Sequence, residues 1–290
     1  MSSLAKRGGL LAVLSLCALA SAAIAGPARF IAIDYPGAVE TLAFGINPAG
    51  DIVGAYKDTA GRQHGFVMRG ATFSSIDIVG AAWTQAYGIT PQGDIVGQFG
   101  RVGDVNTYGF LLRDGSLYEV HVPGQPSTMP FGISPEGAIA GCVHGGPDGM
   151  HGFVLTPDGD SSLQGPMGTM HTGINPQGDV TGYGGNPGNP GSDSGYVIRN
   201  GVTVWFRYPD SLFTRARGIS PTGDVVGVYQ DADRMTRGFL LRHGEFVSID
   251  VERAAMTRAF GINAVGDIVG SYVDSAKMAH GFLMSRRPER

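Results

Sequence analysis

Cysteine, tryptophan and charged residues are all scarce in this 290-residue chain. It has two cysteines and two tryptophans, and Asp, Glu, Lys and Arg together make up 16% of it, against about 25% in a typical soluble domain. Only Cys142 lies beyond the first 25 residues, so a chain without that segment could form no intramolecular disulfide. Stability must come from apolar burial and strand pairing, and we expect Cys142 to be a buried small apolar residue rather than a nucleophile.

The chain also lacks a basic surface and a long hydrophobic run. Without Lys6 and Arg7 it has 19 basic and 25 acidic residues, a net charge of −6, and no basic stripe. A nucleic-acid partner is therefore not expected. The longest apolar run, residues 10–20, is shorter than the ~20 residues that span a bilayer. No integral membrane span is expected in the mature chain.

The N-terminal segment has the pattern of an export signal. Lys6 and Arg7 precede the apolar run, and the small-x-small sequence Ala23-Ile24-Ala25 stands before Gly26. This order of a positive region, an apolar region and a small-residue cleavage site is typical of secretory signal peptides. We therefore predict a signal peptide over residues 1–25 and a secreted or periplasmic protein.

Glycine is abundant, and it recurs at regular places. It accounts for 47 residues, where a usual share is roughly 7%. Six glycines anchor six sequence units spaced 41 to 45 residues apart: Gly45, Gly88, Gly132, Gly173, Gly218 and Gly261. Every unit has a threonine four residues before this anchoring glycine and a second glycine nine residues after it, and five units have an aspartate six residues after it. A period of this length indicates a propeller or a solenoid.

Each unit reads as four short strands. In the first unit these are "TLAFGIN", "DIVGAY", "HGFVMR" and "TFSSID", joined by turns rich in glycine. The sixth unit ends after its third strand, while residues 29–41 match the end of the fifth unit in the spacing of Phe30, Asp34 and Thr41. The N-terminal strand therefore supplies the missing fourth strand and closes a ring. The predicted fold is all-β, a six-bladed β-propeller over residues 26–290 with four strands per blade.

The repeated hairpin and a recurring triplet also carry a resemblance. The hairpin is "GINPAGDIVG", and the triplet occurs as His64-Gly65-Phe66, His151-Gly152-Phe153 and His280-Gly281-Phe282. With these motifs, residues 29–285 resemble the HAF-repeat family of predicted bacterial extracellular proteins, although glycine stands where the family triplet has alanine. The resemblance implies secretion and a repeated β fold, and it transfers no catalytic residues.

The repeated polar residues favour structural roles. The three triplet histidines occupy equivalent places in different blades, so they would lie around the ring instead of converging on a metal. The aspartates follow a glycine in a tight turn, where carboxylates commonly accept backbone N–H bonds. The threonines are interpreted as packing and hydrogen-bonding residues between blades. We expect no cofactor and no metal site.

The repeat breaks at one place that suggests a binding site. The residue before the anchoring glycine is aromatic in four units but is Thr172 in the fourth and Arg217 in the fifth. His171 stands where other units have alanine or proline. Local rules tend to fail at functional sites. The sequence predicts a ligand pocket near the axis, on the face that carries the connections between second and third strands and between blades, lined by His171, Arg215, Arg217 and Arg258, with His144 and Asp193 as outer candidates.

Three functional interpretations follow from this cluster. Arginines would suit an acidic ligand such as a uronic-acid sugar or another carboxylate, which favours a non-enzymatic, monomeric protein that binds an extracellular polysaccharide or protein. Alternatively, the protein is a secreted hydrolase or lyase on an anionic polymer, with His171 as base and the arginines stabilising charge. In the third interpretation there is no site, and the arginines pair with Asp210, Asp231 or Asp233.

Overall fold

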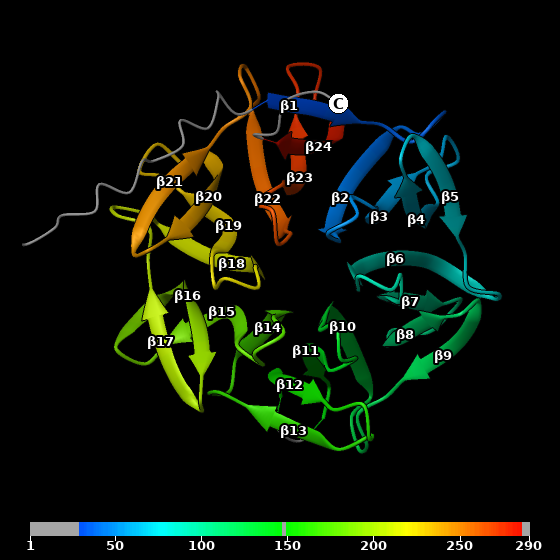
Figure 1. The fold of residues 1–290 in the computed structure, drawn as a ribbon, viewed down its shortest axis with the longest axis horizontal. Coiled ribbons are helices and arrows are strands. Elements are labelled where there is room, and N and C mark those ends of the chain that lie inside the picture. The colour runs from blue at the N-terminus through cyan, green and yellow to red at the C-terminus, as the bar shows by residue number, and fades with distance from the viewer. Residues whose placement is uncertain (1–28, 147–148, 286–290) are drawn as a thin grey trace, which may run out of the picture.

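Six β-sheets stand as blades around a central axis (Figure 1). The computed structural model describes residues 29–146 and 149–285, which form 24 strands. Each blade has four antiparallel strands, the first next to the axis and the fourth on the outside. The predicted six-bladed, all-β propeller is confirmed. The predicted signal peptide, residues 1–25, lies outside the described residues, and no helix within the described ranges is long and apolar enough to cross a membrane.

The strands follow one another in chain order through the blades. Blade 1 contains β2 (Glu40–Ile46), β3 (Ile52–Lys57), β4 (Gln63–Arg69) and β5 (Thr72–Ile76). Blade 2 contains β6 (Ala81–Ile89), β7 (Ile95–Arg101), β8 (Thr107–Arg113) and β9 (Ser116–Val120). Blade 3 contains β10 (Ser127–Ile133), β11 (Ile139–His144), β12 (His151–Leu155) and β13 (Ser161–Gln164). Blade 4 contains β14 (Thr169–Ile174), β15 (Val180–Asn186), β16 (Asn189–Arg199) and β17 (Val202–Phe206). Blade 5 contains β18 (Phe213–Ile219), β19 (Val225–Gln230), β20 (Thr236–Arg242) and β21 (Glu245–Ile249). Blade 6 contains β22 (Met256–Ile262), β23 (Ile268–Val273), β24 (Ala279–Ser285) and β1 (Arg29–Ile33).

The two ends of the described chain meet in blade 6. Strand β1 pairs antiparallel with β24, and Ile31 lies opposite Leu283. The ring of Phe30 packs edge-on against that of Phe282, with centroids 5.4 Å apart. Ile33 is 4% exposed, but Ile31 is 41% exposed because alternate residues of this outer strand face away from the blade. The predicted closure is confirmed, and Ile33 provides more of its burial than Ile31.

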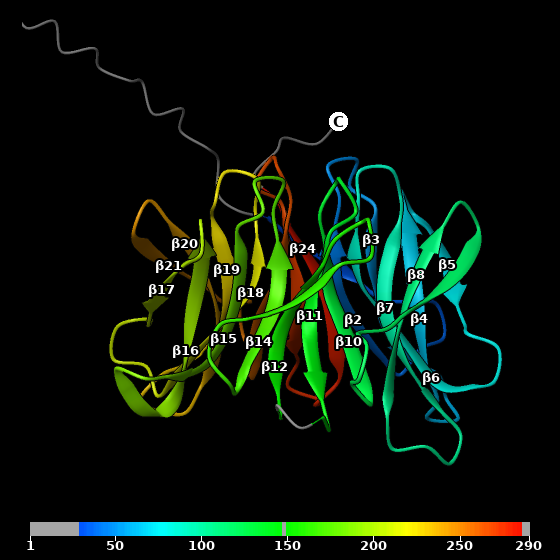
Figure 2. The same ribbon diagram turned by 90° about the horizontal axis from the view of Figure 1, so that it is seen from below.

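The strands run along the axis, so their connections emerge on two opposite faces (Figure 2). Turns between first and second strands leave on one face. Connections between second and third strands, and between blades, leave on the other. In every blade the register of the first and second strands shifts at the residue before the anchoring glycine. Such a bulge re-aims one side chain. The bulged side chains are the ones that surround the axis.

Close approach of neighbouring backbones explains the repeated glycines. A Cβ on Gly45 would overlap the carbonyl oxygen of Tyr87 in the next blade. A Cβ on Gly54 would lie 2.7 Å from the ring of Phe66, which covers it. Equivalent contacts recur around the ring, so these two positions are set by the spacing of the inner strands.

The repeated threonines hold the connections between blades, as predicted. The hydroxyl of Thr41 accepts a hydrogen bond from the backbone N–H of Tyr35 at 2.9 Å, and Thr214 does the same for Tyr208 at 2.9 Å. Thr169 differs, because its hydroxyl donates to the carbonyl of Pro166 at 2.6 Å. In each case the threonine fixes the chain as it enters a first strand.

The repeated aspartates bind side chains where the sequence suggested backbone N–H groups. In blade 2 the carboxylate of Asp94 accepts from Nε of Arg113 at 2.7 Å, and blades 4 and 5 have the equivalent pairs Asp179–Arg199 and Asp224–Arg242. An arginine at the end of the third strand reaches the turn between the first two strands. The ion pair therefore joins two adjacent turns on one face.

Two of the triplet histidines also have structural partners. His64 lies between Asp58 and Asp77, at 3.2 and 2.6 Å, and His280 lies between Asp34 and Asp274, at 2.8 and 3.5 Å. Each joins the loop after the second strand to the end of the outer strand. The described residues contain no group of three or more acidic, histidine or cysteine side chains that could hold a metal ion.

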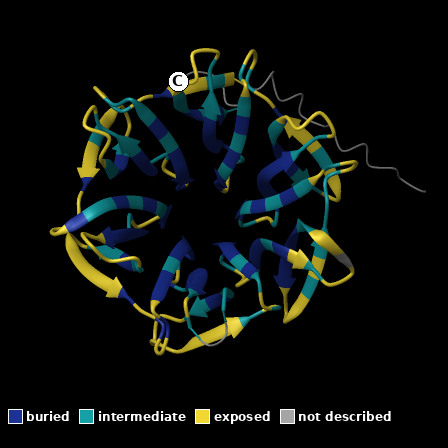
Figure 3. Cartoon of the chain, turned by 180° about the vertical axis from the view of Figure 1, so that it is seen from behind, coloured by how far each residue is buried: buried dark blue, intermediate teal, exposed yellow. Residues whose placement is uncertain are grey.

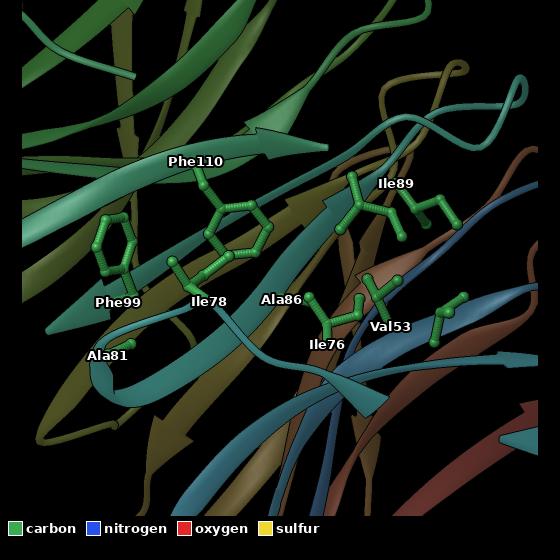
Figure 4. Packing of buried hydrophobic residues seen from close by; sticks show 10 residues of the cluster. Val53, Ile76, Ile78, Ala81, Ala86, Ile89, Phe99 and Phe110 are labelled. Atoms are coloured by element: carbon green, nitrogen blue, oxygen red, sulfur yellow. The ribbon is translucent and has the colours of Figure 1, made fainter. Parts of the chain in front are cut away.

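The hydrophobic core lies between blades as well as within them. One cluster combines Val53 and Ile76 of blade 1 with Ala86, Ile89 and Phe110 of blade 2 (Figure 4). Inner strands are mostly buried and outer strands mostly exposed (Figure 3). Cys142 is fully buried, and burial raises the pKa of its thiol to about 12. The thiol is therefore protonated at neutral pH.

Candidate binding site on the propeller axis

The six bulged side chains form a ring around the axis, which we call the collar. Its members are Phe44, Tyr87, Phe131, Thr172, Arg217 and Phe260. Phe44 stacks on Tyr87 with centroids 4.6 Å apart, and the outer members of this aromatic arc, Phe131 and Phe260, meet them edge-on at 4.9 and 5.3 Å. The arc covers four neighbouring blades. Thr172 and Arg217 occupy the remaining gap.

The collar lines the middle of an axial pocket of about 390 Å³. On one side of the collar its lining includes Leu42, Gln85 and Arg258, each three residues before an anchoring glycine. On the other side it reaches the turns between first and second strands of all six blades, which we call the mouth: Asn47, Pro48, Pro91, Pro135, Asn175, Pro176, Pro221, Asn263 and Ala264. Between collar and mouth each blade adds one isoleucine. The pocket thus has a cationic inner end and an uncharged mouth.

Arg217 and Arg258 bring uncompensated positive charge into this pocket. The guanidinium of Arg217 lies over the rings of Tyr183 and Phe260, at 4.9 and 5.9 Å from their centroids. Its Nε atom is buried and has no hydrogen-bond partner among the described residues. Burial, followed by the charges of Arg217 and Arg215, lowers the pKa of Arg258. Arg215, Arg217 and Arg258 are therefore close enough for their positive charges to repel one another.

Arg215 is the one of the three that has an anionic partner. Its Nε donates to the carboxylate of Asp193 at 2.6 Å, and its guanidinium also lies over the rings of Tyr183 and Phe213. Asp193 belongs to β16, in the long hairpin of blade 4. Within the described ranges neither Arg217 nor Arg258 forms an ion pair with Asp210, Asp231 or Asp233, and Asp231 binds Arg237 at 3.0 Å. Among the residues that the structure describes, the cluster thus keeps two cations without an anionic partner.

His171 lies between blades 3 and 4 and does not line the axial pocket. It is fully buried, over Gly152, where a Cβ would overlap the imidazole ring. Its Nδ1 atom lies 2.6 Å from the hydroxyl of Tyr196, which donates to the carbonyl of Met170 at 2.9 Å. Nδ1 therefore carries the proton. Burial lowers the pKa of His171 to about 3, with a smaller effect from His151, so the ring is neutral.

The remaining outer candidate, His144, lies apart from the arginines. Its Nε2 atom is 3.3 Å from the sulfur of Cys142 on the same strand, β11. Burial lowers its pKa. The structure therefore brings together Arg215, Arg217, Arg258 and Asp193 on blades 4 to 6, whereas His144 and the buried His171 do not line the axial pocket.

The lining of the pocket reaches a different face from the one that the sequence favoured. The sequence favoured the face with the connections between second and third strands, whereas the described lining includes turns between first and second strands, on the opposite face. Sequence reasoning also missed Tyr183, and it placed no aromatic residue in the pocket. The rings of the aromatic arc pack between blades and also line the pocket. Successive side chains of a strand point to opposite sides. Applied to the repeat, this rule places His171 on the opposite side from the positions of Arg215 and Arg217.

Comparison with known proteins shows the fold alone. No family model matches the chain, and no curated protein matches it. AofleA from Arthrobotrys oligospora has a similar structure, with a TM-score of 0.58 and 12% identity over 90% of this chain and 88% of its own. TolB from Agrobacterium tumefaciens has a TM-score of 0.58 and 15% identity, over 84% and 89% of the two chains. The Aleuria aurantia lectin in complex with Fucα1-6GlcNAc has a TM-score of 0.52 and 13% identity, over 84% and 91%. The HAF-repeat resemblance stays a prediction.

Proposed function

We propose that this protein is a secreted, non-enzymatic binding protein whose axial pocket takes a carboxylate group of an acidic extracellular polysaccharide. The observation that carries the proposal is the pair Arg217 and Arg258, two cations in a pocket with no anionic partner among the described residues. A cation withdrawn from water destabilises the fold unless something pairs with it. A ligand carboxylate would supply that partner through charge-assisted hydrogen bonds.

The form of the arginine site favours a carboxylate. A guanidinium presents its donors in a fixed fork that matches the two oxygens of a carboxylate. Tyr183 and Phe260 already hold the plane of Arg217, so little rotamer freedom is lost on binding. A glycan bearing uronic-acid residues would offer this group, and the aromatic arc would contact the C–H faces of its sugar ring.

Binding is favoured over hydrolysis by the composition of the pocket. Its described lining contains no carboxyl and no imidazole group. Burial raises the pKa of Tyr87 above its usual range, against the opposing charge of Arg217, so this phenol is protonated at neutral pH. Because His171 is buried between blades as a weak base, the hydrolase alternative loses the residue that it would use as general base.

Two further observations support the proposal. The pattern of residues 1–25 is that of a secretory signal, which would bring the protein into contact with extracellular glycans. A lectin from Aleuria aurantia shares the propeller fold at 13% identity. That likeness makes a glycan-binding role compatible with the fold and says nothing of which glycan.

The test is calorimetric titration with oligogalacturonate and with the same oligomer after its carboxylates are reduced to alcohols. We expect binding of the acidic form only. Arg217→Ala and Arg258→Ala should each weaken it by about tenfold or more. Arg101→Ala removes the same charge from an exposed site paired with Glu119 outside the pocket and should leave affinity unchanged. Equal binding of the reduced oligomer, or equal losses in all three variants, would reject the arginine site.

A further inference from the structure

We infer that the axial pocket recognises the end of an acidic polysaccharide chain and not an interior stretch of it. This inference rests on the proposed function, because it concerns how the same site meets its ligand. It assigns a single terminal uronate residue to the inner end of the pocket, with the rest of the chain leaving through the mouth.

The first argument is enclosure. Residues of all six blades line the pocket, and the blades form a closed ring around it. A ligand can therefore enter only along the axis. The volume of about 390 Å³ lies near the lower end of the range for small-molecule sites, which suits one or two sugar rings. A polymer lying flat across the mouth could not place an interior residue beside the collar, because the turns and the isoleucines lie between them.

The second argument is the position of charge along the axis. Arg217 belongs to the collar, and Arg258 lies on the side of the collar away from the mouth. The mouth itself consists of asparagine, proline and alanine side chains. An interior segment lying across the mouth would find no cation there, whereas a terminal residue that reaches the collar would find two.

The third argument is the rim outside the mouth. The aspartates that follow the turn glycines lie there, and in blades 2, 4 and 5 each is paired with an arginine at 2.7 to 2.9 Å. In blade 1 the pair Asp51–Arg69 is looser, at 3.8 Å. These arginines are thus already engaged by carboxylates of the protein. A polyanion spread over this face would compete with those carboxylates for these four arginines.

The experiment compares galacturonic acid, its trimer, its decamer and a long polygalacturonate at equal molar chain number, by calorimetry. We expect one protein per chain and an affinity per chain that changes less than about twofold from trimer to polymer. A decamer capped at both ends with neutral galactose should lose about tenfold or more in affinity. Capping leaves the interior carboxylates intact, so this comparison separates chain ends from charge in general.

Two variants locate the entrance. Ala264 is exposed at the mouth, where five other blades have proline, and Ala264→Trp should obstruct entry and weaken trimer binding while the melting temperature stays unchanged. Val265→Trp, on the exposed neighbouring position outside the lining, is the matched control and should bind normally.

The outcomes separate the two proposals. Several proteins per chain, with affinity rising in proportion to length and undiminished by capping, would overturn chain-end recognition and leave the arginine site standing. Undiminished binding by Ala264→Trp would overturn entry through the mouth. An absence of binding by every galacturonate in the series would instead overturn the proposed function itself.

Discussion

Blades 1 and 5 have the same backbone but opposite chemistry at the axis. Both have a threonine, two glycines and an aspartate at the same repeat positions, and both bulge before the anchoring glycine. Blade 1 lines the axial pocket with Leu42 and Phe44, whereas blade 5 has Arg215 and Arg217 at the same two repeat positions. The threonine, the two glycines and the aspartate meet backbone constraints that every blade shares, and we call them the scaffold positions. The axial positions are free of those constraints, and this is why their chemistry can differ from blade to blade.

Removing the closing strand should have the largest effect, because it opens the ring that holds blades 1 and 5 alike. Deletion of residues 29–33 removes the pairing with β24 and the burial of Phe30 and Ile33, worth at least about 4 kcal/mol. It also exposes a strand edge. We expect an aggregated or molten protein in near-ultraviolet circular dichroism. A soluble deletion variant with a fully cooperative thermal transition would show that blade 6 does not need its fourth strand.

Substitution of an inner glycine should cost the same in both blades. A Cβ at Gly54 or Gly227 would overlap the preceding strand's carbonyl oxygen and the covering phenylalanine. Gly54→Ala and Gly227→Ala should each reduce the free energy of unfolding by about 2–3 kcal/mol, which lowers the melting temperature by roughly 4–12 °C. Gly185→Ala, where a Cβ meets nothing, is the control. A large effect in only one blade would mean that the scaffold positions are not equivalent.

The contrast between scaffold positions and axial positions explains what the sequence could predict. Repeated glycines and threonines report backbone geometry that recurs in every blade, and the match of residues 29–41 to the fifth unit reported the closure. The candidate site depended on side-chain direction. His171 stands two residues before its anchoring glycine, whereas Arg217 stands one residue before, so His171 turns between blades toward Tyr196 while Arg217 turns to the axis. Spacing alone did not reveal the bulge, the open face of the pocket or the contact of Arg215 with Asp193.

Blades 5 and 6 differ in a smaller way that pH should expose. Arg237 joins Asp231 and Asp250 in blade 5, and His280 occupies the equivalent place between Asp34 and Asp274 in blade 6. Although burial lowers it, the hydrogen bond and charge of Asp34 and then of Asp274 hold the pKa of His280 above its usual value. The resulting stability is complete below the unfolded pKa of about 6.5 and is lost as pH rises through the higher folded pKa.

The effect should be small, since Asp34 is about half exposed and such pairs contribute under about 1 kcal/mol. His280→Arg would give blade 6 the arrangement of blade 5. Between pH 6 and 8 the melting temperature of this variant should fall less than that of the unchanged protein, by about 1–3 °C. Identical profiles over this range would indicate that the histidine contact contributes nothing to closure.

The most direct measurement is the melting temperature of Arg217→Met with and without oligogalacturonate. Methionine keeps an unbranched side chain and removes a cation that has no anionic partner among the described residues, and replacing buried charge by a packed apolar group is often neutral or stabilising. We predict that the variant melts at the same or a higher temperature than the unchanged protein when ligand is absent, and that it loses most of the stabilisation given by ligand. A variant that melts lower and is still stabilised in full by ligand would show that Arg217 serves the fold and not binding.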